Sequence, residues 1–197
     1  MTQNEGGTRR TNLDTKKLVY LAILTALVVV LQFVSNISAG FLPVPLTLTL
    51  VPIVIGSALC GKWSGAWLGG VFAVVLILTG AAEPFFTFNP FGTIVTVLIK
   101  GVAAGIAAGL VYSLLEKKNK YLAICVAGFT APIVNTGLFI AGSYIFFLDT
   151  IKEWAGGTDV FAYIILAMVG VNFLVELGLN IILAPTALRL INLKKND

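Results

Sequence analysis

The chain has 197 residues, of which 58% are hydrophobic and 11% are charged, with a net charge of +4 and no histidine. A soluble domain usually carries about a quarter charged residues. The composition and the mean hydropathy of +0.97 therefore argue against a soluble protein and predict one all-α integral membrane domain. Because histidine is the commonest metal ligand and the usual general base, we expect no catalytic residues, no metal site and no enzyme activity.

Apolar runs near the length needed to cross a bilayer, about 20 residues each, follow one another along the chain. The second and third are short and are separated only by the sequence GKW, so we expect a tight helical hairpin. The prediction is a bundle of six transmembrane helices within residues 16–192, between a polar tail at 1–15 and a short tail at 193–197. The predicted spans are 16–35, 45–61, 63–80, 90–115, 121–148 and 160–190.

Basic residues are distributed unevenly around these spans. An even number of spans puts both termini on one side, and that side holds nearly all the lysines and arginines, whereas Lys152 lies on the other. Cytoplasmic loops are enriched in Lys and Arg, so both termini are predicted to be cytoplasmic. Membrane topology explains the basic patches, and we expect no nucleic-acid partner. The cytoplasmic basic residues would be Arg9, Arg10, Lys16, Lys17, Lys62, Lys117, Lys118, Lys120, Arg189, Lys194 and Lys195.

The predicted external loops are rich in proline, glycine and aromatic residues. They contain the sequences ISAGFLPV, AAEPFFTFNP and DTIKEWAGGTD. We expect ordinary turns whose aromatic side chains anchor the helix ends at the membrane interface. The alternative is that the three loops together form a lid over a pocket that opens outward.

Two ionisable side chains fall deep inside predicted spans, Lys100 in the fourth and Glu176 in the sixth. Such groups are costly in a bilayer and usually face the bundle interior, a partner or a cavity. Snorkelling is the structural alternative for Lys100, but the residue lies far from either end of its span. A structural Lys100–Glu176 pair that joins two helices is a second alternative, because buried pairs can be purely structural.

Polar residues share helical faces with both charges. Asn89, Thr93, Thr96 and Lys100 are spaced by four, three and four residues, and Asn172, Glu176 and Asn180 by four and four, so each set lies on one face. The combination suits a pocket for a small hydrogen-bonding solute, in which Lys100 binds a carboxylate or phosphate. The predicted substrate-binding residues are Asn89, Thr93, Thr96, Lys100, Asn135, Asn172 and Glu176.

Small residues recur at four-residue intervals in three spans, a pattern that lets helix backbones approach closely. Packing within the bundle is the expected role of these strips in the third and fourth spans. The chain has no GxxxxGK[ST] phosphate loop, so it is not itself an ATPase of that type. We therefore expect a binding subunit that obtains energy from partners. The small residues are Ala22 and Ala26, Gly65 and Gly69, and Gly101, Gly105 and Gly109.

Several segments share local signatures with one known family. They are KKLVYLAILTAL, PVPLTLTLVPIVIGSALCGKWSGAWLGGVFAVV, NPFGTIVTVLIKGVAAGIAAGLVY, APIVNTGLFI, DTIKEWAGGTDV and GVNFLVELGLN. These segments resemble the substrate-binding S components of energy-coupling factor (ECF) vitamin transporters, over nearly the whole chain after about residue 16. The resemblance implies a six-helix protein of the bacterial plasma membrane that captures a vitamin from outside and topples in the membrane to carry its pocket inward.

The resemblance also implies partners. A transmembrane coupling (T) protein and two cytoplasmic ATPase subunits would complete the importer, with ATP used by those ATPases and no cofactor in this chain. Ala22 and Ala26 match the family's AxxxA motif, which implies that they contact the coupling protein. The family's pocket lies between the external loops and the outer halves of the last three helices, which agrees with the predicted polar face.

The overall sequence is most similar to S components assigned to pantothenate, whose carboxylate Lys100 would suit. Glu176 departs from this simple picture, because a lysine and a glutamate together make a neutral site. Riboflavin, folate, biotin and thiamine remain alternatives, although a ligand with a hydrophobic ring would call for aromatic side chains inside the pocket, and here they cluster in the loops. A different function is also open: a self-sufficient ion-coupled carrier for a small polar metabolite, with Glu176 as its proton site.

Overall fold

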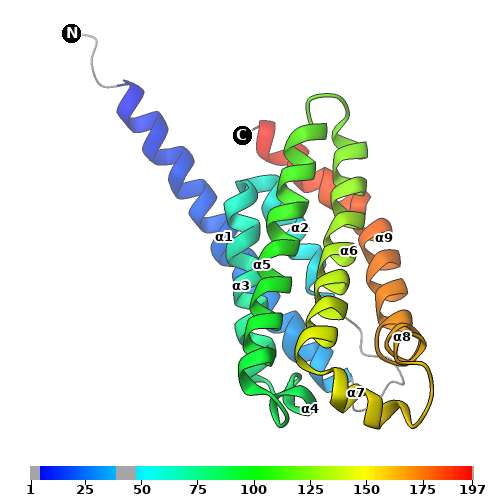
Figure 1. The fold of residues 1–197 in the computed structure, drawn as a ribbon. Helices are drawn as coiled ribbons and strands as arrows, with labels where there is room; N and C mark the ends of the chain where they lie inside the picture. The colour runs from blue at the N-terminus through cyan, green and yellow to red at the C-terminus, as the bar shows by residue number, and fades with distance from the viewer. Residues whose placement is uncertain (1–4, 39–47, 197) are drawn as a thin grey trace.

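The computed structural model describes residues 5–38 and 48–196, and within them every regular element is helical. The short helices α4, α7 and α8 gather at one end of the molecule, whereas the start of α1, the end of α9 and the α5–α6 turn lie at the other (Figure 1). The helices are α1 (Glu5–Ser38), α2 (Leu50–Cys60), α3 (Lys62–Leu78), α4 (Glu83–Phe86), α5 (Pro90–Leu115), α6 (Lys120–Phe146), α7 (Leu148–Ala155), α8 (Val160–Tyr163), the π-helix η1 (Ile164–Val169) and α9 (Gly170–Asn196).

Four helical segments of the described chain are long and apolar enough to cross a membrane. They are Thr15–Ile37, Pro90–Leu115, Lys120–Phe146 and Val160–Asn192. The predicted second and third spans correspond to the shorter apolar helices α2 and α3, of 11 and 17 residues. The structure is thus that of a helical membrane bundle, while the count of six spans and the cytoplasmic position of the termini remain predictions. Helix α1 begins at Glu5, inside the segment predicted as a polar tail.

Two of the predicted external loops contain helices. AAEPFFTFNP contains α4, and DTIKEWAGGTD forms most of α7, whereas ISAGFLPV lies largely outside the described residues. Helix α7 forms because its apolar residues repeat at helical spacing: Ile151 and Ala155 are buried on one face, while Asp149 and Lys152 pair at 3.1 Å on the exposed face. It ends at Gly156, whose φ of 56° is the left-handed conformation that glycine adopts readily.

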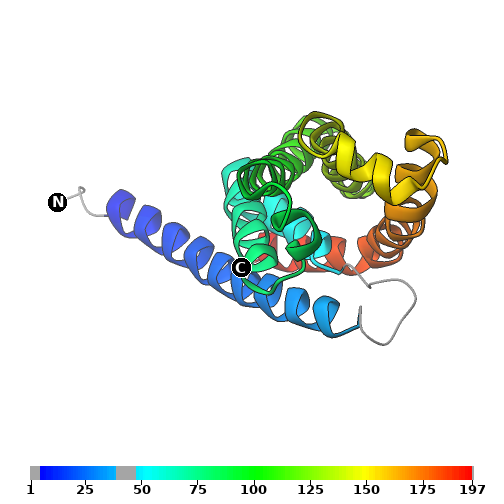
Figure 2. The ribbon, with the colours of Figure 1, turned by 60° about the horizontal axis from the view of Figure 1, so that its bottom comes forward.

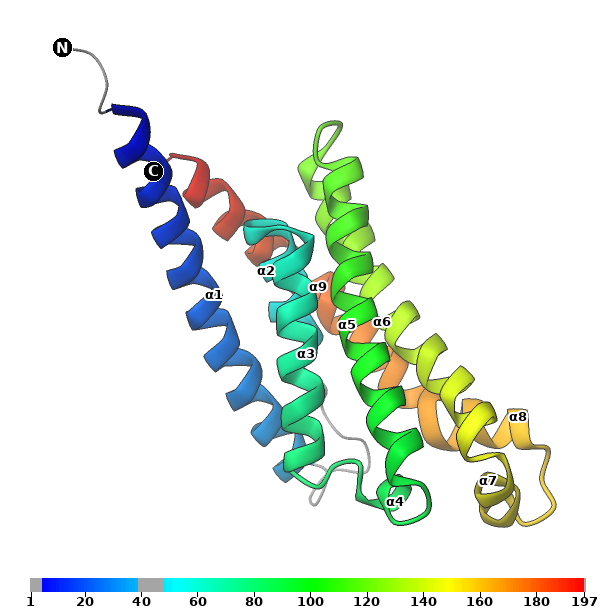
Figure 3. The ribbon, with the colours of Figure 1, turned by 60° about the vertical axis from the view of Figure 1, so that its left-hand side comes forward.

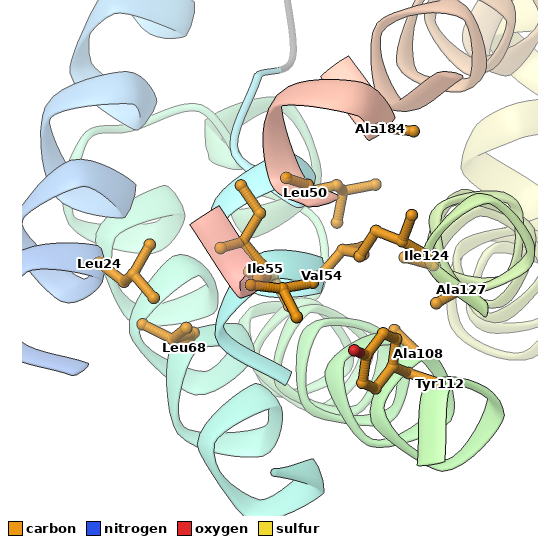
Figure 4. Close-up of a cluster of buried hydrophobic side chains, with 14 of the residues drawn as sticks. Leu24, Leu50, Val54, Ile55, Leu68, Ala108, Tyr112, Ile124, Ala127 and Ala184 are labelled. Carbon is orange, nitrogen blue, oxygen red and sulfur yellow. The ribbon is translucent and has the colours of Figure 1, made fainter. Parts of the chain in front are cut away.

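The main core lies in the half of the bundle near the α5–α6 turn, between α1, α2, α3, α5, α6 and α9 (Figure 4). It is built from aliphatic side chains such as Leu50, Val54 and Leu68, which pack against alanines of α5, α6 and α9. A second cluster, centred on Phe147, Ile151, Ile164 and Val169, joins α7 and the π-helix at the opposite end. A cavity lies near the end that the short helices occupy, and Phe147 of the second cluster is one of its lining residues.

Helix α3 lies between α1 and α5 (Figure 3), and glycines allow its close approach to α5. A Cβ atom on Gly65 would collide with the carbonyl of Gly105, and one on Gly69 with the carbonyl of Gly101. The predicted role of these small residues in packing within the bundle is therefore confirmed. The contact fixes the rotation of α5 about its axis, because a helix can approach this closely only along its glycine strip.

The predicted sixth span is divided into α8, η1 and α9. In a π-helix the backbone bonds run from residue i to i+5, and accordingly Ile164 and Val169, five residues apart, are both buried against the second cluster. Gly170 ends this wide turn, and a Cβ there would lie 2.5 Å from the Ile165 carbonyl oxygen. The π-helix therefore changes the rotation of the polar residues that follow it on α9.

Candidate functional site

A cavity of about 190 Å³ lies beside the short helices α4 and α7. Its walls come from α3, α4, α5 and α6, with Phe147 at the junction of α6 and α7; Figure 2 shows the bundle from the end at which these short helices lie. One charged residue, two hydroxyls and three aromatic rings are among its lining groups. The lining residues are Leu76, Ala81, Ala82, Phe85, Thr93, Thr96, Val97, Lys100, Phe139 and Phe147.

The polar wall of the cavity comes from α5. Asn89 caps this helix: its Oδ1 accepts a hydrogen bond from the Gly92 amide at 2.9 Å, and Pro90 occupies the first turn, where no donor is needed. From this start, Thr93, Thr96 and Lys100 line the cavity at helical spacing. The structure thus brings together three of the four polar residues predicted to share this face.

Asn89 differs from its neighbours on that face. Besides capping α5, its Nδ2 donates to the carbonyl of Phe146 at 3.4 Å and so connects α5 to the end of α6. It does not line the cavity. A residue just before a proline and a helix is a typical N-cap, and Asn89 has this role here; that it also binds substrate stays a prediction.

The ammonium of Lys100 lies over the ring of Phe139, with Nζ 5.0 Å from the ring centroid. A lysine at this distance is attracted by the negative face of the ring. Glu176 also attracts Lys100. The ion pair found within 4.0 Å among the described residues is a different one, between Lys152 and Asp149 of α7. Lys100 and Glu176 therefore attract each other across a longer gap than a contact ion pair.

Glu176, 1% exposed, belongs to a polar ladder along α9. Asn172 donates to its Oε1 at 3.1 Å, and Asn180 donates to its backbone carbonyl at 2.8 Å. The predicted common face of these three residues is present. Asn172 and Glu176 are not among the residues that line the cavity. The charge of Glu176 nevertheless acts on Lys100 at the cavity wall.

Two further polar side chains, Asn135 and Ser143 of α6, are buried. Asn135 is 6% exposed, and its Oδ1, like Thr96 Oγ1 and Ser143 Oγ, has no hydrogen-bond partner among the described residues. Buried polar groups are nearly always hydrogen-bonded, so these atoms are candidates to bind a polar ligand. Thr96 lines the cavity, whereas Asn135 and Ser143 are not among its lining residues. Asn135 was among the predicted site residues, whereas Ser143 was not, because a lone serine in an apolar helix has no distinctive sequence signal.

Aromatic side chains are the residues that the sequence-based prediction missed. The expectation that aromatic rings stay in the loops and outside the pocket is wrong, because Phe85, Phe139 and Phe147 all line the cavity. Phe85 comes from a predicted loop that folds over the site. Phe139 lies on α6 four residues after Asn135, a spacing that puts the two on one helical face. This spacing was the sequence signal that could have placed Phe139 in the site.

The two alanines predicted to contact a partner lie on α1. The side chains of both Ala22 and Ala26 are exposed, beside large exposed residues such as Ile23 and Val30. Residues of α1 that pack on the bundle, such as Leu24 and Val28, lie on the opposite face. The side chains of the alanines therefore face away from the packed bundle and are accessible on its outer surface.

The described residues contain no group of three or more His, Cys, Asp or Glu side chains that could hold a metal ion. The fold and the site instead define a class: a helical membrane protein with a small cavity lined by one lysine, two hydroxyls and three aromatic rings. A family model described as "ECF transporter, substrate-specific component" matches residues 16–188. The chain belongs to this family of ECF transporter S components.

Two curated relatives are transporters, not enzymes. The pantothenic acid transporter PanT of Lactococcus lactis subsp. cremoris (strain MG1363) is 27% identical over 193 residues, covering 90% of this chain and 94% of the relative. The biotin transporter BioY of the same strain is 36% identical over 67 residues, 34% of this chain and 35% of the relative. No solved structure matches the chain.

Proposed function

We propose that the protein is the substrate-capture subunit of an ECF-type importer and that it binds pantothenate in the cavity between α4, α5 and α6. The observation that carries the proposal is the position of Lys100, a cation at the wall of a small cavity beside two threonines. A carboxylate is the group that such a cation binds best, because charge-assisted hydrogen bonds are the strong ones.

Pantothenate has a carboxylate at one end, an amide in the middle and two hydroxyl groups at the other end. Lys100 would bind the carboxylate, and the hydroxyl of Thr96, which also lines the cavity, would bind a neighbouring polar group. The buried Oδ1 of Asn135 on α6, outside the lining residues, would bind a further polar group if the ligand reaches that far. The match to PanT over 90% of the chain supports this choice over biotin, since the match to BioY covers only 34%. The negative charge of Glu176 would repel a second carboxylate and so favours a ligand with a single one.

The same proposal includes the membrane and the partners. The protein would cross the bacterial plasma membrane six times with both termini in the cytoplasm, so that α4 and α7 face the outside. A coupling T protein would contact α1 at Ala22 and Ala26, whose exposure leaves a smooth strip for a second helix. Two ATPase subunits would supply the energy by hydrolysing ATP.

The direct test is to purify the protein in detergent and identify any copurified small molecule by mass spectrometry. Binding of radiolabelled pantothenate to the washed protein is then measured, with biotin as an unlabelled competitor. We expect pantothenate to bind one-to-one and biotin not to compete. Tight binding of biotin and none of pantothenate would overturn the choice of substrate while leaving the S-component function intact.

Uptake into liposomes tests the partner requirement. The chain alone should not accumulate pantothenate, whereas liposomes that also contain a coupling protein and the ATPases should do so when ATP is supplied. Accumulation by the chain alone under a proton gradient would contradict the proposal and support an ion-coupled carrier in which Glu176 is the proton site.

A further inference from the structure

A row of aromatic rings leads from Lys100 to the surface at α7. The ammonium lies over Phe139 of α6, and the Phe139 ring meets the ring of Phe85 of α4 edge to face, with centroids 5.6 Å apart. Phe85 meets Trp154 of α7 at 5.5 Å in the same manner. Three rings on three separate helices thus connect the charged wall of the cavity to a tryptophan.

Other contacts hold the row in place. Phe85 also packs edge to face on Phe147 at 5.1 Å, and Trp154 packs on Phe88 at 5.7 Å. Phe147 is 3% exposed and belongs to the cluster that anchors α7 through the buried Ile151. Each ring contact depends on orientation as well as distance, because the negative face of one ring attracts the positive edge of the next. A tilt of Phe139 would therefore change the contacts of Phe85 and, through it, of Trp154.

A carboxylate in the cavity would change the position of the first ring. A hydrogen bond to a charged group is stronger than the attraction of an ammonium to an aromatic ring. A bound anion would thus draw the Lys100 ammonium away from the centre of the ring. Phe139 and Phe85 both line the same cavity, so each would also touch a ligand directly.

We propose that Phe139 is a positioning residue that holds the ammonium of Lys100 at the cavity wall and, through Phe85, transmits occupancy of the cavity to Trp154 on α7. The proposal rests on the assignment of the cavity as the substrate site. It adds that ligand binding is coupled to the contact between α4 and α7, and that Trp154 reports it.

The chain allows a direct optical test, because its three tryptophans are Trp63, Trp67 and Trp154. The double variant Trp63→Phe, Trp67→Phe leaves Trp154 as the only indole. In this background, pantothenate is titrated while Trp154 emission is recorded, and binding is measured independently with radiolabelled pantothenate. We expect a saturable change in emission at the concentrations at which the radioligand binds.

Phe139→Leu keeps an apolar side chain but removes the ring. We expect radioligand affinity to fall only about 2- to 5-fold, since Lys100 keeps its own contact with the ligand and only its positioning by the ring is lost, while the emission response falls to less than a quarter. The matched control is Phe129→Leu, on the same helix and outside the row of rings, which should alter neither quantity. A full emission response in Phe139→Leu would overturn the proposal.

A second measurement makes the proposal independent of the substrate assignment. Without added ligand, Phe139→Leu should shift the emission maximum of Trp154 or its quenching by acrylamide, and Phe129→Leu should not. If pantothenate binds neither the protein with Trp154 as its only indole nor its Phe139→Leu variant, the proposed substrate is wrong. The ligand-free comparison then decides by itself whether Phe139 controls the surroundings of Trp154. An unshifted spectrum in Phe139→Leu would then overturn the coupling.

Discussion

Gly69 of α3 and Gly101 of α5 face each other so closely that a Cβ atom on either one would collide with the backbone carbonyl of the other. Lys100 immediately precedes Gly101 in the chain. Because no side chain separates the two backbones at this point, the packing of α3 on α5 fixes the direction in which Lys100 leaves its helix.

The first prediction concerns this contact. Gly101→Ala should lower the free energy of unfolding by about 1–3 kcal/mol, because the added methyl group must displace a backbone carbonyl. The measurement is an SDS titration of the protein in detergent, followed by circular dichroism. Gly137→Ala is the matched control, since a Cβ at Gly137 meets nothing within 4 Å and alanine is the better helix former. Equal stability of the two variants would contradict the close packing of α3 on α5.

The second prediction separates binding from structure at Lys100. Lys100→Met should weaken pantothenate binding about 10- to 150-fold, the value of a hydrogen bond to a charged group, and should leave the melting temperature unchanged or higher. Lys100 forms no contact ion pair within the described residues, so replacing it with an apolar side chain of similar length breaks no buried salt bridge, the change that is strongly destabilising. Radioligand binding and thermal unfolding provide the two measurements.

Two other results for Lys100→Met would decide between the alternatives. If the variant is largely unfolded, but its remaining folded fraction binds pantothenate normally, the attraction between Lys100 and Glu176 has a structural role. A variant that folds and binds as well as the parent protein would show that the cavity is not the substrate site.

The third prediction compares two threonines on one helix face. Thr93 Oγ1 donates to the carbonyl of Asn89 at 2.9 Å, whereas Thr96 Oγ1 has no partner among the described residues. Thr96→Val should therefore preserve or raise stability, by up to about 1 kcal/mol, while weakening pantothenate binding about 3- to 10-fold. Thr93→Val should lower stability slightly. If Thr96→Val binds pantothenate normally, its hydroxyl does not contact the ligand.

The fourth prediction concerns Asn89, which was expected to bind substrate and is found as a helix cap. Asn89→Ala should destabilise the protein by about 1 kcal/mol, whereas Asn89→Asp keeps an acceptor for the Gly92 amide and should recover most of that loss. Both folded variants should bind pantothenate like the parent. A stable Asn89→Asp protein with impaired binding would restore Asn89 to the substrate site.

The fifth prediction tests the exposed alanines of α1. Ala22→Trp or Ala26→Trp should leave pantothenate binding unchanged and abolish ATP-dependent uptake, because a bulky ring prevents close approach of a partner helix. Phe33→Trp is the control, since Phe33 is a large exposed side chain on the same helix, and uptake should continue. Loss of pantothenate binding in the alanine variants would instead show that these residues support the fold of the subunit itself and not a contact with a partner.

Several features follow from the sequence alone because their causes are local. The apolar composition requires a membrane protein. Helix α5 begins at Pro90 and extends to Leu115, the bounds predicted from its flanking Asn-Pro pair and its apolar length. Helical periodicity also places Thr93, Thr96 and Lys100 on one face, which the structure confirms.

Tertiary structure decides what that face meets. A repeat of 3.6 residues shows which side chains share a face, but the neighbour depends on contacts between distant segments, such as Gly69 with Gly101 and Phe85 with Phe139. The sequence thus identified a lysine that needed a partner in the membrane. Only the packed bundle shows that Lys100 meets an aromatic ring at 5.0 Å in addition to the charge of Glu176, because the ring comes from another helix and its orientation depends on a third.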